Sequence, residues 1–363
     1  MLDKDKGGYF SIHPSGQLEC TTKQQYLPSS NILQTRFFDA DGVVDLVDFF
    51  PRPKTTKTLY KGLKTSAYRE MTSVQEELKK WMVRRVECIR GKFSLDVEIF
   101  PAFEYATAPH TTTIIQEENV PFAPESKTVT FHSEKVKLQL DVSIDRGEDE
   151  SLDSYPTVRF KKVKKPGMLG EGVVATIDLL EGQAVSFVLR DDVPNHVTEH
   201  ITNAVLDTQQ HDTQTFWYNW ISKCKYKGRW REVVTRSFFI LKLLTYEPTG
   251  AIIASPTFSL PEEIGSTRNW DYRYSWIRDS SFTVYILLRL GFTEEADAYM
   301  EFISDRLSNS RVADGGLPIM FGIRGETDLY VACSNLPNLP SPFILLKPPF
   351  NQKHPKKAKK ERG

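Results

Sequence analysis

The sequence predicts a β + α multidomain protein, in which an antiparallel β-sandwich precedes a helical region. Up to about residue 190, apolar residues alternate with polar ones, which is the period of a strand with one buried face. After Pro194 the apolar residues recur at helical spacing instead. The 363 residues also exceed the length of one ordinary core, so the chain is expected to divide into domains.

The strands are predicted from five segments. The clearest one ends at Pro101 and alternates apolar positions at Phe93, Leu95, Val97 and Ile99. The same period runs from Val136 to Ile144. Further candidates are "GVVDLVDFF", "GVVATIDLL" and "AVSFVLRDD", the last two joined by the turn-like Glu181-Gly182. Residues 1 to about 190 are therefore expected to form an antiparallel sandwich.

The helices are predicted from apolar stripes and their end signals. The first stripe contains Phe216, Trp217, Trp220 and Ile221, and the second Val233, Val234, Ser237, Phe238, Leu241 and Leu244. Pro248-Thr249-Gly250 should end the second helix.

A third helix should begin near Asp279 or Ser280, whose side chains can cap free N–H groups, and stop at Gly291. Thr293 opens a fourth, with acidic residues in its first turn. The long connection from Glu247 to Arg278 has no helical period, and such connections are often functional.

Composition excludes several classes of function. The 47 basic residues balance the 47 acidic ones, so neither a nucleic acid nor an anionic membrane is expected as partner. The cysteines form no C-x-x-C pair, which favours a reduced compartment; they are Cys20, Cys88, Cys224 and Cys333. No signal-peptide core or membrane span is evident, and a cytoplasmic location is expected.

The stretch "NWDYRYSWIRDSSF", residues 269–282, combines aromatic rings with arginines and aspartates. Aromatic faces stack on the C–H faces of a sugar, while Arg and Asp can fix its hydroxyl groups. Taken singly, Asp279 could be a helix N-cap and Arg278 its ion-pair partner. Tryptophans such as Trp270 and Trp276, taken alone, are more often core residues than a stacking surface. Composition alone indicates only a small polar ligand.

A longer segment carries a family resemblance. "REVVTRSFFILKLLTYEPTGAIIASPTFSLPEEIGSTRNWDYRYSWIRDSSFTVYILLRLGF" resembles the intracellular branch of glycoside hydrolase family 15, the glucoamylase, trehalase and glucodextranase-like enzymes. The resemblance extends forward to "GGLPIMFGIRGETDL" and backward through "REMTSVQEELKKWMVRRVECIRGKFSLDVEIFPAFEYA". It implies a β-sandwich followed by a partial (α/α)6 six-hairpin toroid.

The resemblance also implies domain limits. A sandwich domain would occupy residues 1–194, incomplete at its start, and a helical linker 195–230. The first hairpins of the barrel would occupy 231–329, followed by a divergent Pro/Lys-rich tail at 330–363. The basic cluster at the end of this tail could be a nuclear address or a solvated end.

The resemblance assigns the site and its chemistry. A terminal glucose would be bound by Tyr274, Trp276, Arg278 and Asp279, with Trp270, Phe321 and Gly322 as further pocket residues. The substrate would be an α-glucoside, whether trehalose, a maltodextrin or an isomaltose-type sugar. Hydrolysis with inversion uses a carboxylic acid and a carboxylate base and implies no metal or organic cofactor. The oligomeric state is left open.

Catalytic residues are not assigned, because the family's two glutamates lie beyond the matching segments. Loop carboxylates expected near the pocket, but matching no family catalytic position, are Glu262, Glu263, Asp314, Glu326 and Asp328. Glu326 and Asp328 are each expected to cap a turn instead.

Two alternatives follow. One is a truncated homologue without catalysis that retains only a glucose-binding subsite, with apolar helix faces that favour association. The other is a zinc peptidase, because His196, Glu199 and His200 satisfy the H-x-x-E-H pattern.

Overall fold

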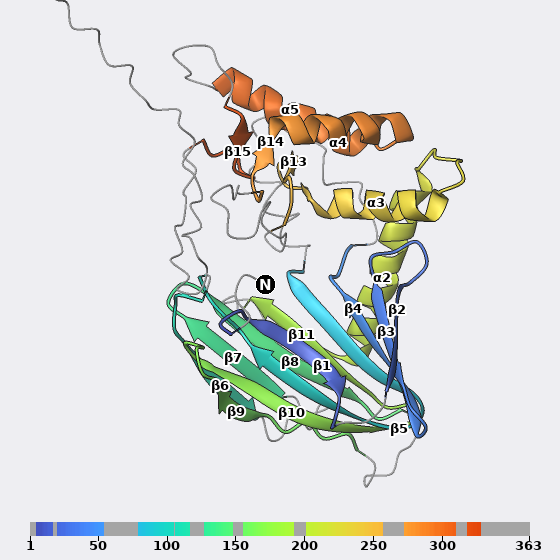
Figure 1. Ribbon diagram of the computed structural model, residues 1–363, viewed down its shortest axis with the longest axis vertical. Coiled ribbons are helices and arrows are strands. Elements are labelled where there is room, and N and C mark those ends of the chain that lie inside the picture. Colours follow the sequence, from blue (N-terminus) through green and yellow to red (C-terminus); the bar gives the residue numbers. More distant parts are fainter. Residues whose placement is uncertain are drawn as a thin grey trace, which may run out of the picture. The chain divides into compact units, whose positions relative to one another are not determined.

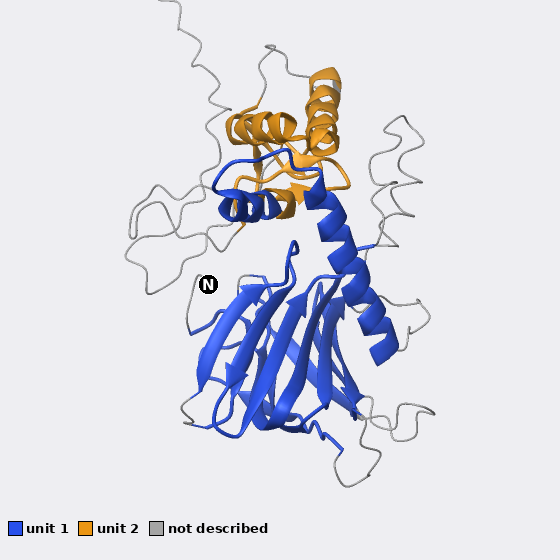
Figure 2. Ribbon diagram, turned by 90° about the vertical axis from the view of Figure 1, so that its right-hand side faces the viewer, with its two compact units in different colours: residues 1–240 blue, residues 241–363 orange. Residues whose placement is uncertain are grey.

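A computed structural model describes residues 5–16, 20–53, 79–104, 106–116, 127–147, 155–191, 201–256, 272–309 and 318–327. The chain divides into two compact units, residues 1–240 and residues 241–363 (Figure 2). The first contains the large sheet and helix α2, and the second contains helices α4 and α5. Helix α3 crosses the boundary.

The first unit is built on one branched sheet of eleven antiparallel strands (Figure 1). Its main path runs in the order β2-β3-β4-β5-β11-β8-β7-β6, while β1 and β10 pair with β5, and β9 pairs with β10. The strands are β1 (Tyr9–Pro14), β2 (Thr21–Tyr26), β3 (Leu33–Phe38), β4 (Gly42–Phe49), β5 (Trp81–Phe100), β6 (His110–Gln116), β7 (Lys127–Ser133), β8 (Lys137–Asp145), β9 (Lys161–Lys164), β10 (Glu171–Leu180) and β11 (Ala184–Asp191).

The 20-residue strand β5 belongs to two groups of strands. Its first half pairs with β4 and β11, whereas its second half, from Lys92 onward, pairs with β1 and β10. The change falls at Gly91, whose φ is 71°. A Cβ there would stand 2.1 Å from the carbonyl oxygen of Asp41. Only glycine fits such a left-handed, closely approached position.

Both groups of strands contribute to one apolar core. Val97 of β5 and Ile177 of β10 belong to the same buried cluster as Val86 and Phe187 from the other group, and all four side chains are fully buried. The alternation that predicted the strand ending at Pro101 is confirmed, since its apolar residues are all buried. An antiparallel, β-rich first part is therefore confirmed, and its description as a sandwich stays a prediction.

The helices follow the sheet along the chain, as predicted. They are α2 (Asn203–Ser222), α3 (Arg231–Leu243), α4 (Ile277–Leu290) and α5 (Thr293–Asn309). The stripe predicted for the first helix is confirmed, because its four apolar side chains are buried in α2. The stripe predicted for the second is wrong at its start: Val233 is 64% exposed, while Phe238 and Phe239 are buried. The toroid stays a prediction.

The second unit combines α4 and α5 with two short two-stranded antiparallel sheets. The strand β12 (Thr245–Tyr246) pairs with β13 (Ala251–Ile252), and β14 (Ser275–Trp276) pairs with β15 (Met320–Phe321). Helix α4 ends at Gly291, whose φ of 99° makes it the predicted left-handed C-cap.

The start of α4 was wrongly predicted. The helix begins at Ile277, two residues before Asp279, and its N-cap position is Trp276, which makes no side-chain capping bond. The Ile277 N–H donates instead to the carbonyl of Ile319 at 3.1 Å. Tertiary pairing with the segment before β15 thus takes the place of a local cap.

Several predicted features lie outside the described residues: the limit at 194/195, the H-x-x-E-H motif, Trp270, Cys333 and the tail after 329. Among the described residues, no cluster of metal-binding side chains occurs. No helix in the described ranges has the length and apolar character needed to cross a membrane.

Candidate functional site

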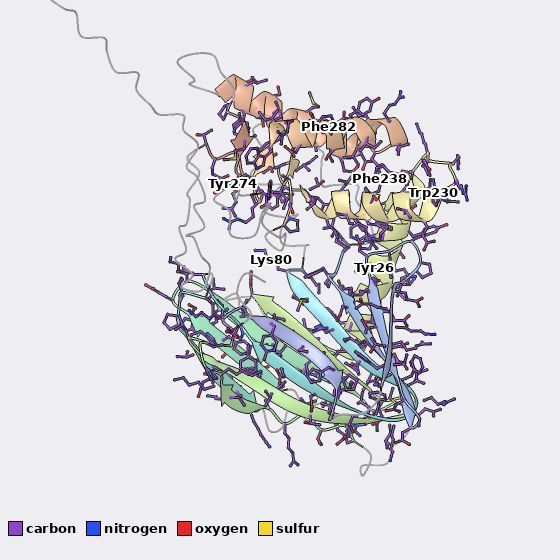
Figure 3. The ribbon with its side chains drawn as sticks, in the orientation of Figure 1. Tyr26, Lys80, Trp230, Phe238, Tyr274 and Phe282 are labelled. Atoms are coloured by element: carbon purple, nitrogen blue, oxygen red, sulfur yellow. The ribbon has the colours of Figure 1, made fainter. Side chains whose placement is uncertain are left out.

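Four residues predicted to bind a sugar lie within one short stretch, residues 274–279, where β14 leads into α4. Trp276 ends the strand, and Arg278 and Asp279 lie in the first helical turn. Tyr274 lies just before the strand, where its carbonyl accepts a hydrogen bond from the N–H of Ala254 at 3.1 Å; Figure 3 labels this tyrosine. All four side chains are at least partly exposed to solvent. The structure thus presents them on one short surface segment.

The charged pair of this segment is exposed rather than locked in place. Arg278 Nη2 lies 3.2 Å from Asp279 Oδ2, and the side chains are 78% and 39% exposed. An exposed pair of this kind contributes little to stability. Asp279 also lies at the positive end of the α4 dipole, where a carboxylate is favoured. Both groups are therefore available to a ligand.

Buried hydroxyl groups support the segment from below. Ser280 Oγ donates to the carbonyl of Ile252 in β13 at 3.1 Å and lies 3.4 Å from Ser275 Oγ. The hydroxyl of Tyr299 in α5 is buried near both serines. Burial raises the pKa of Tyr299, and the serine hydroxyls partly oppose this rise. The cluster joins β13, β14, α4 and α5 beneath the exposed residues.

A buried ionic network lies in the same unit. Lys242 Nζ is 2.8 Å from Glu247 Oε1 and 2.8 Å from Glu295 Oε1, and the three side chains are 3%, 6% and 2% exposed. Glu247 begins the turn between β12 and β13, so the network fixes that hairpin between α3 and α5. The same hairpin carries Ile252, which accepts the bond from Ser280.

The further pocket residues have different surroundings. Phe321 is buried, with its ring 6.1 Å from that of Phe302 in an edge-on arrangement, and it pairs with Ser275 of the neighbouring strand β14. Gly322 lies against Glu326, whose Oε2 would be 2.1 Å from a Cβ at this glycine. A pocket role for either residue stays a prediction.

Comparison with known proteins identifies the family. Residues 228–329 match the model of the glycosyl hydrolases family 15. Similarity to curated trehalases extends much further: the enzyme of Mycolicibacterium smegmatis is 31% identical over 328 residues, 90% of this chain and 44% of its own length. The trehalase of Thermoplasma acidophilum is 29% identical over 85% of this chain, and that of Mycobacterium tuberculosis 29% over 92%.

The chain belongs to glycosyl hydrolases family 15.

The family match contains every predicted sugar-binding residue. The chain spans about 44% of the length of the trehalases it resembles. Of the loop carboxylates expected near the family 15 pocket, only Glu326 is among the described residues. Its Oε2 accepts a hydrogen bond from the backbone N–H of Arg324 at 3.0 Å. Glu326 therefore caps a turn, as its sequence position indicates.

Sequence reasoning missed the buried polar groups of this family 15 unit. Lys242 interrupts the apolar run "SFFILKLLTY". Because a lysine within an apolar stripe is costly to bury alone, it could have signalled a buried partner. Nothing local pointed to Glu295, whose position in a first helical turn is explained equally well by the helix dipole.

Proposed function

We propose that this chain supplies the terminal-glucose subsite of a trehalase-like glycosidase that hydrolyses an α-glucoside with inversion. Similarity to three trehalases over at least 85% of the chain is the observation that carries the proposal. The family 15 match supports glycosidic-bond hydrolysis as the reaction class. We also propose, from the family alone, a six-hairpin arrangement of the helical part and a cytoplasmic location.

In this proposal the first sugar ring packs against Trp276 and Tyr274. Partly exposed aromatic rings suit the apolar faces of a pyranose. Arg278 donates to the sugar hydroxyls and Asp279 accepts from them, each as a charge-assisted hydrogen bond. No metal or organic cofactor is needed, because acid and base groups suffice for this hydrolysis.

The acid and the base are not assigned to residues of this chain. Inversion requires two carboxyl groups about 6.5–9.5 Å apart, with a water molecule between one of them and the sugar. Glu326 is a poor candidate because its carboxylate is bonded to the turn that contains it. This observation favours a second candidate function, in which the chain binds glucose without cleaving the substrate.

Glucose release from trehalose and maltose tests the proposal, together with calorimetric titration of glucose. We expect release from trehalose in preference to maltose, and at least about a tenfold loss on Asp279→Asn, because one charge-assisted hydrogen bond is removed. Ser281→Ala serves as the control, since this exposed hydroxyl bonds only its own helix, at the Arg278 carbonyl.

The two candidate functions are separated by the same measurements. A folded protein that binds glucose through Asp279 but releases none would leave only the binding function. A folded protein that neither binds glucose nor cleaves either sugar would contradict both.

A further inference from the structure

A concave site lies entirely within the first unit. It has a volume of about 1060 Å³ and is lined by the end of β2 and the following turn, by the last turn of α2, and by α3. This volume is close to the upper end of small-molecule sites in proteins. The family 15 sugar segment, residues 274–279, contributes nothing to its lining.

Arg236 lines this pocket, and several contacts hold its guanidinium in position. Its guanidinium carbon lies 3.8 Å from the ring centroid of Tyr26 and 4.9 Å from that of Phe239. Nη1 donates to the carbonyl of Ser30 at 3.2 Å, and Nη2 donates to Oδ1 of Asn31. A guanidinium has five N–H groups, so donors remain for a ligand after these two bonds.

The charge of Arg236 lacks a counterion within the described part of the chain. Burial lowers the pKa of Arg236, and the opposing influence comes from the Tyr26 hydroxyl rather than from a carboxylate. Two further cations, Lys227 and Arg231, line the same pocket together with one acid, Glu232. None of these three cations forms an ion pair with a described residue. The pocket is therefore electropositive, and an anion would offset the cost of the half-buried cation.

Aromatic side chains surround these cations. Tyr26 is 47% exposed and Tyr218 is 61% exposed, and Tyr226 lines the same space (Figure 3 labels Tyr26). Their phenol hydroxyls can donate and accept hydrogen bonds, and their ring faces can pack against a sugar ring. Gln24 and Gln25 add amides, although each already donates one bond to β3. The lining combines ring-stacking surfaces with positive charge.

We propose that this pocket binds a pyranose that carries an anionic group. The anion lies against Arg236 with Lys227 and Arg231 at the rim, and the sugar ring packs against the tyrosines. The shared chemistry is a negative charge on a sugar ring, and a phosphate ester or a carboxylate can supply it. This site is separate from the glucose subsite proposed above and does not depend on it.

Titration calorimetry on the full chain tests the site with four probes: glucose 6-phosphate, glucuronate, glucose and inorganic phosphate. We expect at least one anionic sugar to bind about tenfold or more tightly than glucose and than inorganic phosphate, and to bind more weakly as salt is added. The first two probes distinguish a phosphate ester from a carboxylate. Equal affinity for glucose and the anionic sugars, or no binding of either anionic sugar, would overturn the proposal.

Variants locate the site. Arg236→Gln should weaken binding of the anionic sugar about tenfold or more, because charge-assisted bonds are lost. Arg236 also ties α3 to the turn after β2, so this variant could fail to fold. The exposed double variant Lys227→Gln/Arg231→Gln keeps that tie and should weaken binding about threefold or more, whereas the matched control Glu232→Gln should not weaken it.

The variant Asp279→Asn distinguishes binding at the pocket from binding at the glucose subsite. Anionic-sugar binding that persists in this variant and is lost in the double variant supports the pocket. Binding that is lost with Asp279→Asn and unaffected by the double variant would belong to the glucose subsite and would overturn this inference while leaving the proposed function intact.

Discussion

The two units differ in how deeply a network of charged groups is buried. In the first unit, ion pairs keep contact with solvent: Lys165 and Glu98 are 38% and 29% exposed, and Arg84 and Asp48 14% and 24%. In the second unit, the side chains of Lys242, Glu247 and Glu295 are almost completely buried.

The difference shows how each unit acquires its geometry. The strands of the sheet bury a continuous apolar cluster. Burial of apolar surface therefore stabilises the first unit. The helical unit positions its hairpin and the start of α4 through buried polar bonds, which are directional and costly to leave unpaired. We infer that the sugar-binding segment depends on these bonds for its position.

Replacing Lys242 tests this contrast with the largest expected effect. Lys242→Met leaves two carboxylates buried without their shared cation, which should cost about 3–5 kcal/mol of stability in the second unit. The matched change Lys165→Met in the first unit should cost about 1 kcal/mol, because its partner Glu98 remains accessible to water. Hydrogen exchange of the α5 amides would measure the loss of stability in the second unit, and urea unfolding would measure the loss in the first. Equal losses would remove the distinction between the units.

The buried hydroxyls provide a smaller test. Ser280→Ala leaves the Ile252 carbonyl without its donor and should destabilise the second unit by about 1–3 kcal/mol. It should also weaken glucose binding, because the start of α4 is no longer tied to β13. Tyr299→Phe is the companion variant: the buried Tyr299 hydroxyl lies near both serines but has no hydrogen bond of ordinary geometry, so its removal should not destabilise the second unit. If both variants behave alike, the serine does not support the segment.

A pH-dependent effect in the first unit is the smallest expected. Hydrogen bonding from Tyr9 and the nearby Lys165 together lower the pKa of Glu98, against the opposing effect of burial. A lowered folded-state pKa adds stability above the ordinary glutamate pKa, and this stability is lost as the pH falls through the folded value. Urea unfolding of the protein and of Glu98→Gln should therefore differ by about 1 kcal/mol or less at neutral pH and converge in acid. A difference that grows in acid would contradict this assignment.

Much of the fold could be predicted because it depends on local patterns. Alternation at Leu95 and Val97 identifies a strand, since only a period of two places both side chains on one buried face. Gly291 marks the end of α4 because glycine adopts the left-handed conformation of a C-cap without steric strain. The partly exposed position of Tyr274, Trp276, Arg278 and Asp279 agrees with the predicted ligand-binding segment.

One error arose where a distant segment replaced a local cap, and the other where a helical position faces an open pocket and not the core. The N-cap expected from Asp279 is absent because Ile319 supplies an acceptor for the first helical N–H. Val233 fits the helical period of α3, yet it lies in the wall of the open pocket. Ile319 is far from Asp279 in sequence, and the turn after β2 that helps to line the pocket is far from Val233.

The sequence by itself determined the β-then-α order, the family and the segment that carries the candidate sugar-binding residues, because periodicity and motif are properties of neighbouring residues. Only the tertiary structure decided that β5 serves two groups of strands, that Lys242 pairs with Glu295 in another helix, and that Arg236 lies between Tyr26 and Phe239. These arrangements depend on distances between remote segments, and each is retained because its loss would leave polar groups without partners.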